Sequence, residues 1–253
     1  RWKGAISQVT KSNSIRENAY SIEGKVRFSE VDHTGTMTLP GIINYFQDCS
    51  TFQSEELGLG IEHSAEKHRA WILSSWQVIV ERSPKLGESV KVSTWASGFN
   101  RFFGERNFCM QDEEGTMIAY ANSVWVYMDV EKGRPVRPAP EEVESYGTGE
   151  PLEMVQASRK VAMPEAAADA ESFPVMRHQI DTNEHVNNCQ YVQMALEVLP
   201  EPVQVREVRV SYKKSAVYGD TIYPKIAKEE DRTVVELCDE QGNPYAVVEL
   251  HIK

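Results

Sequence analysis

The chain has 253 residues and a formal net charge of -11, and hydrophobic residues make up 41% of it. This length allows one large domain or two small ones. The acidic charge excludes broad nucleic-acid binding, which needs a basic surface. No apolar stretch approaches the roughly 20 residues that a membrane-spanning helix requires. We therefore expect neither a nucleic-acid partner nor a membrane partner.

Four cysteines, Cys49, Cys109, Cys189 and Cys238, are widely spaced and form no CxxC pair. This spacing argues against a zinc site and against a disulfide framework, and it fits a reducing cytoplasm. The N-terminal sequence RWKGAISQVT has no apolar core of the signal-peptide kind. We expect a cytoplasmic protein that carries no metal and no cofactor.

The first half predicts one helix followed by strands. Pro40 suits the first turn of a helix, and apolar residues recur at helical spacing from Ile42 to Phe52. Gly58 and Gly60 are plausible ends for that helix. Apolar residues then alternate around 76–80, 90–92, 101–110 and 117–128. Such alternation is typical of antiparallel strands with one buried face.

Prolines concentrate between residues 131 and 175, which hold six of the twelve. This stretch includes PEAAADAES, which reads as a connector more easily than as a short helix. We predict an N-terminal unit over residues 1–140, a connector over 141–172 and a C-terminal unit over 173–253.

The second half repeats the order of elements. A stripe of apolar residues from Tyr191 to Val198, ended by Pro200, predicts a helix. Alternating segments around 208–212, 222–226, 233–238 and 245–252 predict strands. One helix followed by a run of strands, twice over, is an α+β pattern in which each helix packs on a sheet face.

Three pairs of stretches match between the halves, in the same order. VDHTGTMTLPGIINYFQDC parallels IDTNEHVNNCQYVQMALEV and places Asp32 against Asp181. VERSPKLGESV parallels SYKKSAVYGDTI and places Gly87 against Gly219, and DEEG parallels DEQG. Together these matches indicate an internal duplication.

The stretch DTNEHVNN, residues 181–188, gathers carboxylate, amide and imidazole groups before the second helix. Asp181, Asn183 and His185 would all face one side only on an extended segment. We therefore predict that 181–185 is extended and leads into a helix that begins near Asn187 or Asn188, since Asn is a strong N-cap residue. Spacing alone leaves open a bland alternative, in which this is only a polar cap and the histidine is structural.

Over nearly its whole length the chain resembles the acyl-ACP thioesterases, which act on acyl groups carried by the acyl carrier protein (ACP). The resemblance includes FSEVDHTG, LPGIINYFQDCSTFQSEELG, WILSSWQV, ANSVWVYMD and RHQIDTNEHVNNCQYVQMALE. The Asp-x-Asn-x-His-Val-Asn-Asn match is its most specific part. It implies a tandem (double) hotdog, with two antiparallel sheets that each wrap a central helix, although a fold alone says little about function.

The resemblance also implies an acyl-ACP hydrolase of fatty acid biosynthesis, with Asp181, Asn183 and His185 as catalytic residues. His185 can act as the base for a water molecule, because an imidazole exchanges protons near neutral pH. Asn183 can orient the water or donate to an oxygen, and Asp181 can orient a neighbour or stabilise a protonated imidazole. Free N–H groups at the start of the helix can hold the oxyanion.

One position departs from the family pattern, which normally has a Glu followed by a Cys or a small residue on the strand after this helix. Ser215 and Ala216 stand there in this chain. Ser215 cannot be a carboxylate base but can hydrogen-bond a water, so it is kept as a candidate catalytic residue. Ala216 has no thiol, which argues against a cysteine nucleophile.

The first half has Thr34 and Thr36 where the second has Asn183 and His185, so we expect no chemistry there. The resemblance implies that the N-terminal unit houses the acyl chain instead. Candidate substrate-binding residues are Ile43, Phe46, Trp71 and Trp76, for each of which core packing is the alternative.

The expected partner is an ACP that carries a fatty acyl thioester. Basic residues could meet this acidic carrier or could simply be solvated: Arg101, Arg106, Arg206, Arg209, Lys213 and Lys214. Two other functions stay open, an acyl-CoA thioesterase on the same scaffold and a non-catalytic acyl-binding protein impaired at Ser215. A homodimer is conceivable, although the duplication already supplies an internal pair.

Overall fold

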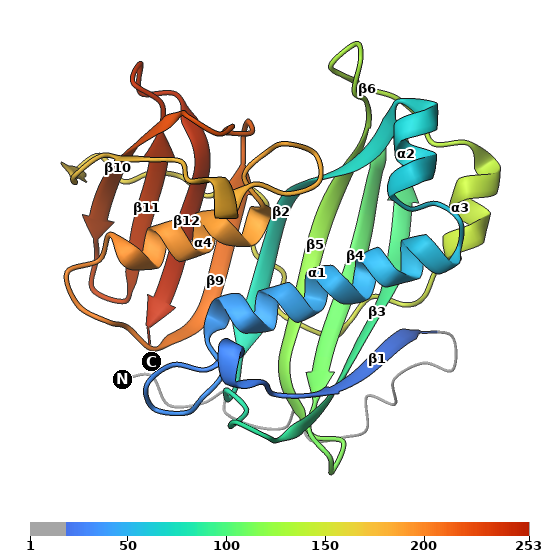
Figure 1. The fold of residues 1–253 in the computed structure, drawn as a ribbon, viewed down its shortest axis with the longest axis horizontal. Coiled ribbons are helices and arrows are strands. Elements are labelled where there is room, and N and C mark those ends of the chain that lie inside the picture. Colours follow the sequence, from blue (N-terminus) through green and yellow to red (C-terminus); the bar gives the residue numbers. More distant parts are fainter. Residues whose placement is uncertain (1–18, 253) are drawn as a thin grey trace.

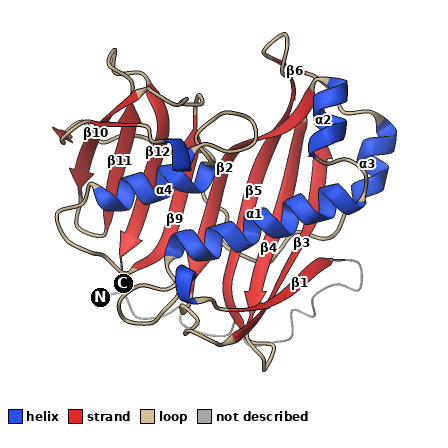
Figure 2. Cartoon of the chain, in the orientation of Figure 1, coloured by secondary structure: helices blue, strands red, loops and turns tan. Residues whose placement is uncertain are grey.

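The computed structural model describes residues 19–252, so the expectation about the first ten residues lies outside the described part. Within that part, twelve strands form a single antiparallel sheet. Two long helices cross one face of this sheet, as Figures 1 and 2 show. The chain is therefore α+β with helices packed on a sheet, as its sequence predicts.

The N-terminal half contains a long helix and a strongly curved set of strands. The helix α1 spans Leu39–Glu56, and two short helices, α2 (Ile61–Lys67) and α3 (Pro140–Tyr146), flank the far end of the sheet. A short 3-10 turn, η1, covers Phe28–Glu30. The strands are β1 (Tyr20–Lys25), β2 (Arg69–Val80), β3 (Ser89–Asn100), β4 (Phe103–Gln111), β5 (Met117–Asp129) and β6 (Arg134–Pro135).

The C-terminal half repeats this plan with a shorter helix. The 3-10 turn η2 (Arg177–Gln179) precedes α4 (Asn188–Glu197). The strands are β7 (Ala168–Asp169), β8 (Phe173–Pro174), β9 (Val205–Tyr212), β10 (Thr221–Lys228), β11 (Arg232–Cys238) and β12 (Pro244–Ile252). The predicted strands and both predicted helices are confirmed, and PEAAADAES forms no helix.

The two halves join edge to edge. Strand β2 pairs with β9, so that Trp76 lies opposite Val210 and Gln77 opposite Arg209. The expected two sheets are therefore continuous, in the order β1-β3-β4-β5-β2-β9-β12-β11-β10-β7. One hydrophobic core runs through both halves beneath α1 and α4.

The connector crosses the opposite face of the sheet, where strand side chains hold its backbone. Trp95 donates its indole N–H to the Glu150 carbonyl (3.0 Å). Asn107 accepts from the Leu152 N–H (3.1 Å), and Gln77 accepts from the Ala157 N–H (3.0 Å). These bonds satisfy buried strand polar groups that would otherwise lose their hydration.

Candidate active site

Residues 181–185 form a tight turn, so the prediction of an extended segment is wrong. The Asp181 N–H donates to the His185 carbonyl (2.8 Å), and one Asp181 carboxylate oxygen accepts from the Asn183 N–H (2.8 Å). Glu184 has a φ of 60°, in the left-handed region. The reason is local, because an Asp side chain that captures the N–H two residues ahead bends the chain.

The turn leads directly into α4. Asn187 is the N-cap, and its side-chain oxygen accepts from the Cys189 N–H (2.9 Å), which confirms the predicted start of the helix. The Asn187 and Gln190 N–H groups also have acceptors, in the carbonyls of Gln179 and Asn187. Three of the amides around the helix start are therefore already engaged, and an oxyanion would need other donors, such as the Asn183 side chain.

His185 and Ser215 belong to neighbouring segments. His185 bridges to Val217 in antiparallel fashion, and the Val186 N–H donates to the Ala216 carbonyl (2.9 Å). Ser215 therefore lies two residues before Val217, the residue that bridges to His185. The side chains of Asn183, His185 and Ser215 lie in exposed residues, and within 19–252 they make no hydrogen bond. Their polar atoms are thus free to meet water and a substrate.

The structure does not join the Asp181 carboxylate to the His185 ring by a hydrogen bond within the described residues. Asp181 instead shapes the turn through the Asn183 N–H. Asp181 therefore holds the backbone that carries Asn183 and His185. It does not orient a neighbouring side chain through a hydrogen bond in the described residues, as the sequence predicted.

Tyr191 supports the Ser215 loop from below. Its hydroxyl accepts from the Ala216 N–H (2.8 Å). Burial raises the pKa of Tyr191 to about 12, against the effect of that N–H, while the charges of Asp220 and Asp181 add to the rise. The phenol therefore stays protonated at neutral pH and serves as a fixed anchor for the loop.

The N-terminal half also holds the start of α4. Gln47 on α1 donates to the Asn187 side-chain oxygen (3.2 Å). Trp76 on β2 donates to the Tyr212 hydroxyl (3.2 Å), which in turn donates to the Asn188 carbonyl (2.9 Å). The site is therefore positioned by both halves of the chain, although its candidate catalytic residues come from one.

Sequence reasoning missed Gln47, Tyr191 and Tyr212. Tyr191 follows the DTNEHVNN stretch by three residues, and its apolar spacing made it look like core alone. Gln47 and Tyr212 could not be found by pattern, because their roles depend on contacts between the two halves.

The cysteines are not nucleophiles near neutral pH. All four are buried and free. Burial raises the pKa of the thiols to about 12 for Cys49, Cys189 and Cys238 and to about 11 for Cys109. Because the thiolate is the reactive form, these side chains behave as small hydrophobic groups.

Three of the candidate substrate-binding residues lie in the core. Ile43, Phe46 and Trp76 are almost fully buried. Phe108 packs against two of them, with its ring 5.3 Å from that of Phe46 and 5.7 Å from that of Trp76. Trp71 packs against Phe99 and Tyr127 at 5.7 and 4.9 Å. Their contact with an acyl chain stays a prediction.

An open groove of about 460 Å³ lies beside α4, in the C-terminal half. Its walls come from the 170–173 segment, from Gln179 and from one side of α4 (Gln193, Met194, Glu197 and Val198). The volume is within the range of small-molecule sites. At the corresponding place in the N-terminal half, the unbroken strand β1 closes on α1, where Tyr45 donates to the Lys25 carbonyl (3.2 Å).

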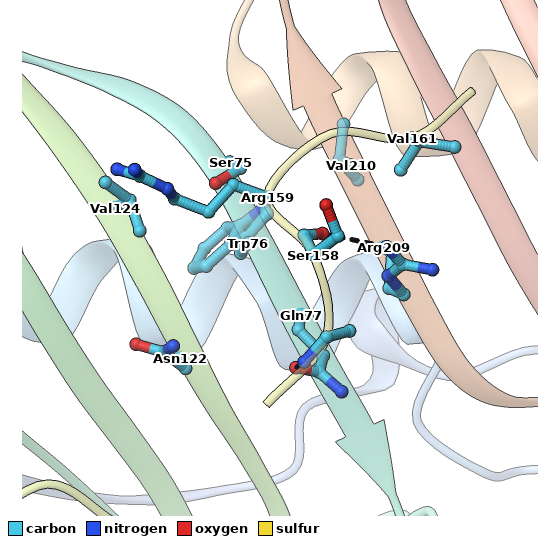
Figure 3. Close-up of a pocket in the computed structure, with 11 residues that line it drawn as sticks. Ser75, Trp76, Gln77, Asn122, Val124, Ser158, Arg159, Val161, Arg209 and Val210 are labelled. Atoms are coloured by element: carbon cyan, nitrogen blue, oxygen red, sulfur yellow. Dashed lines mark hydrogen bonds between the residues drawn. The ribbon is translucent and has the colours of Figure 1, made fainter. Parts of the chain in front are cut away.

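A second, much smaller cavity of about 20 Å³ lies under the connector, against β2 and β9 (Figure 3). Arg209 reaches across it to the Ser158 carbonyl (2.8 Å). This space suits about one water molecule, so it is no substrate site.

Two of the predicted carrier-binding cations are not available. Arg106 is buried, where it donates to Gln53 (2.5 Å) and stacks on Tyr146. Arg209 pairs with the buried Glu249 under the connector. Lys214 is engaged by Asp239, whereas Arg101, Arg206 and Lys213 are exposed. Charge alone did not reveal which sheet face each residue occupies.

Within the described residues, no helix is long and apolar enough to cross a membrane. In the same part of the chain, no three His, Cys, Asp or Glu side chains gather as metal ligands.

Curated relatives with similar sequences come from plants. Palmitoyl-acyl carrier protein thioesterase, chloroplastic, from Gossypium hirsutum is 25% identical over 198 residues, which cover 73% of this chain and 48% of the relative. Oleoyl-acyl carrier protein thioesterase, chloroplastic, from Coriandrum sativum is 22% identical, with 97% and 73% covered. The chain spans about half the length of several curated relatives it matches.

Solved structures of acyl-ACP thioesterases share the fold. An acyl-ACP thioesterase from Bacteroides thetaiotaomicron superposes with a TM-score of 0.83 at 22% identity, covering 93% of this chain and 98% of that one. The 12:0-ACP thioesterase from Umbellularia californica gives 0.82 at 17% identity, with 93% and 97% covered. The fold of this chain is thus the double hotdog of these proteins.

Family models account for most of the chain. Residues 17–146 match the acyl-ACP thioesterase N-terminal domain, and residues 163–251 match the acyl-ACP thioesterase C-terminal domain. The second match contains the turn at 181–185 and the Ser215 loop. The chain belongs to the acyl-ACP thioesterase family.

Proposed function

We propose that the protein hydrolyses acyl-ACP thioesters to a free fatty acid and ACP. The observation that carries this proposal is the turn at the start of α4. It presents to solvent the side chains of Asn183 and His185, which have no hydrogen-bond partner within residues 19–252, in a chain that belongs to this family.

In the proposed reaction, the imidazole of His185 takes a proton from water as the water oxygen attacks the thioester carbonyl. The Asn183 amide can donate to the oxyanion that develops. When the C–S bond breaks, the imidazolium returns its proton to the departing thiolate of the carrier arm. Asp181 keeps both side chains on one rigid turn through its bond to the Asn183 N–H.

The direct test is to measure hydrolysis of a series of acyl-ACPs that differ in acyl chain length. Purified protein is incubated with acyl-ACPs of short to long chain, and the released thiol is measured. Hydrolysis is expected to fall by about 10²–10⁴-fold in His185→Ala. Absence of any turnover above this variant, on every chain length, would refute hydrolysis.

Ser215 favours a second candidate, a non-catalytic acyl-binding protein. The residue is exposed, has no carboxylate and makes no hydrogen bond within the described residues. Ser215→Glu separates the two candidates. A large gain in hydrolysis would show that the natural protein is impaired in water activation, whereas tight acyl binding without turnover would favour binding alone.

The proposal also includes ACP as the carrier and fatty acid biosynthesis as the pathway. Matched acyl-CoA and acyl-ACP substrates are to be compared by kcat/KM, with ACP preferred. A preference that comes from charge contacts with the carrier should weaken with salt.

A further inference from the structure

Exposed apolar side chains gather beside the candidate catalytic turn. Met176, Val217 and Tyr218 are 50%, 41% and 52% exposed. Val217 is the residue that bridges to His185, and Met176 stands at the start of η2, which leads into the turn. Isolated exposed apolar residues are ordinary, but a group next to a reaction site indicates contact with a partner.

The group is held in place by specific contacts. The Arg177 guanidinium lies 4.5 Å from the centre of the Tyr218 ring. The Val217 N–H donates to Asp220 (3.0 Å), and the Met176 N–H donates to the Gln179 side chain (2.8 Å). We call Met176, Arg177, Val217 and Tyr218 the docking platform. Its contacts already fix the surface, which lowers the entropy cost of binding.

The charges on and near the docking platform differ from those of the whole chain, whose net charge is -11. Arg177 and Lys213 are exposed and have no ion-pair partner within residues 19–252. The Asp220 carboxylate is turned to internal donors, the Val217 N–H and the Tyr245 hydroxyl. Glu184, at the tip of the turn, and the partly buried Asp181 are acidic exceptions.

We infer that the docking platform binds the carrier domain of the substrate, a small acidic protein with its thioester on a flexible phosphopantetheine arm. The inference rests on the proposed function. Arg, Tyr and Met are enriched in protein interfaces, and unpaired cations attract an acidic surface. The platform adjoins His185 through Val217, so a carrier docked there starts its arm beside the turn.

The N-terminal half supplies a matched control surface. The Met37 N–H donates to the Pro84 carbonyl, as Val186 does to Ala216, so Lys85 corresponds to Val217. Lys85 is an exposed cation without an ion pair among the described residues, next to a turn that has Thr36 at the position of His185. A charge reversal at Lys85 alters the total charge as much as one at Arg177 does, but away from the site.

The test compares two substrates that share one acyl group, acyl-ACP and the acyl-pantetheine thioester. In Arg177→Glu and in Tyr218→Ala, kcat/KM for acyl-ACP is expected to fall about tenfold, with a weaker salt dependence in the arginine variant. The value for acyl-pantetheine should stay unchanged. Lys85→Glu should leave both values unchanged, and thermal unfolding should show that all three variants are folded.

Other outcomes overturn the inference in distinguishable ways. Equal losses on both substrates would mean that Arg177 and Tyr218 act through the turn. An equal loss in Lys85→Glu would mean that only total charge matters. No loss in either platform variant would place the carrier elsewhere. If the unaltered protein cleaves neither substrate, the proposed function itself fails, and the docking inference with it.

Discussion

The turn at Asp32 and the turn at Asp181 share one backbone frame. The Thr34 N–H donates to Asp32, as the Asn183 N–H donates to Asp181, at 2.8 Å in both cases. Thr36 bridges to Lys85, as His185 bridges to Val217. Even the bonds that close the turn repeat, from the Asp32 N–H to Thr36 and from the Asp181 N–H to His185.

The difference lies in the side chains that the frame leaves free. In the first half, the Thr34 hydroxyl donates to Asp32 (2.6 Å) and meets the Thr36 hydroxyl (2.7 Å). The Thr34 hydroxyl holds the pKa of the Asp32 carboxyl below its usual value. In the second half, Asn183 and His185 make no such bonds within the described residues. The first turn bonds its polar side chains to one another, while the second leaves the side chains of Asn183 and His185 exposed and without hydrogen bonds among the described residues.

Exchanging the free side chains gives the largest expected effect. Asn183→Thr combined with His185→Thr should lower acyl-ACP hydrolysis by about 10²–10⁴-fold, because the base is lost while the frame is kept. The reciprocal pair, Thr34→Asn with Thr36→His, should leave hydrolysis unchanged. Rates with acyl-ACP and melting temperatures are the measurements. Full activity in the first variant would show that the chemistry lies elsewhere.

The helix caps give the next effect. Asn187→Ala and Thr38→Ala should each lower the free energy of unfolding by about 1 kcal/mol, because each side chain accepts an N–H from the first turn of its helix. Only Asn187→Ala should also slow hydrolysis, since it releases the bond from Gln47 beside the site. Urea unfolding and kcat together check this. A similar loss of activity in Thr38→Ala would contradict the assignment of the site to one half.

A smaller effect concerns the left-handed position of each turn. Gly35 has a φ of 76°, and its counterpart Glu184 has a φ of 60°. Glu184→Gly should raise the free energy of unfolding by about 0.5 kcal/mol, because relief of roughly 1–2 kcal/mol of strain exceeds the glycine entropy cost of roughly 0.5–1 kcal/mol. Gly35→Glu should destabilise, although no atom lies within 4 Å of an added Cβ. Chemical denaturation of both variants is the measurement, and opposite signs are required.

The smallest effect concerns two corresponding ion pairs, Arg82–Asp112 and Lys214–Asp239. Lys214 lowers the pKa of Asp239 to about 2. A carboxyl group whose pKa is lower in the folded than in the unfolded protein stabilises the fold at pH values above the unfolded pKa of roughly 3.9. This stabilisation is lost as the pH falls toward the folded pKa. Lys214→Met should therefore be less stable than the unaltered protein at neutral pH, and this difference should shrink as the pH falls from roughly 4 toward 2. Urea unfolding of both proteins along an acid series checks this, and a difference in stability that does not change with pH would count against the pair.

Local patterns in the sequence were enough to predict the helices and strands. The N-cap at Asn187, the helix behind Pro40 and the alternating strands all depend on neighbours within a few residues. The turn at 181–185 was misread as extended because the alternation of Asp181, Asn183 and His185 was weighed without the tendency of Asp to bond the second N–H ahead. Its pairing with Asp32 was visible, but its shape was not.

Contacts between distant segments could not be predicted. Trp76 and Tyr212 meet because β2 pairs with β9, which no local pattern in either strand specifies. Arg106 looks like any surface arginine in the sequence, yet its strand turns it beneath α1. The same limit applied to the groove beside α4, which depends on the break between β7 and β8.

The edge-to-edge pairing of β2 with β9 also has an evolutionary consequence. In a symmetric homodimer both copies of a site carry every substitution. One copy therefore cannot be altered for binding while the other is kept for reaction. Here the two copies are encoded separately and are held in one sheet whatever the protein concentration. Each copy could therefore change alone. The first half has threonines at positions 34 and 36, where the second half has Asn183 and His185, and such independence permits a difference of this kind.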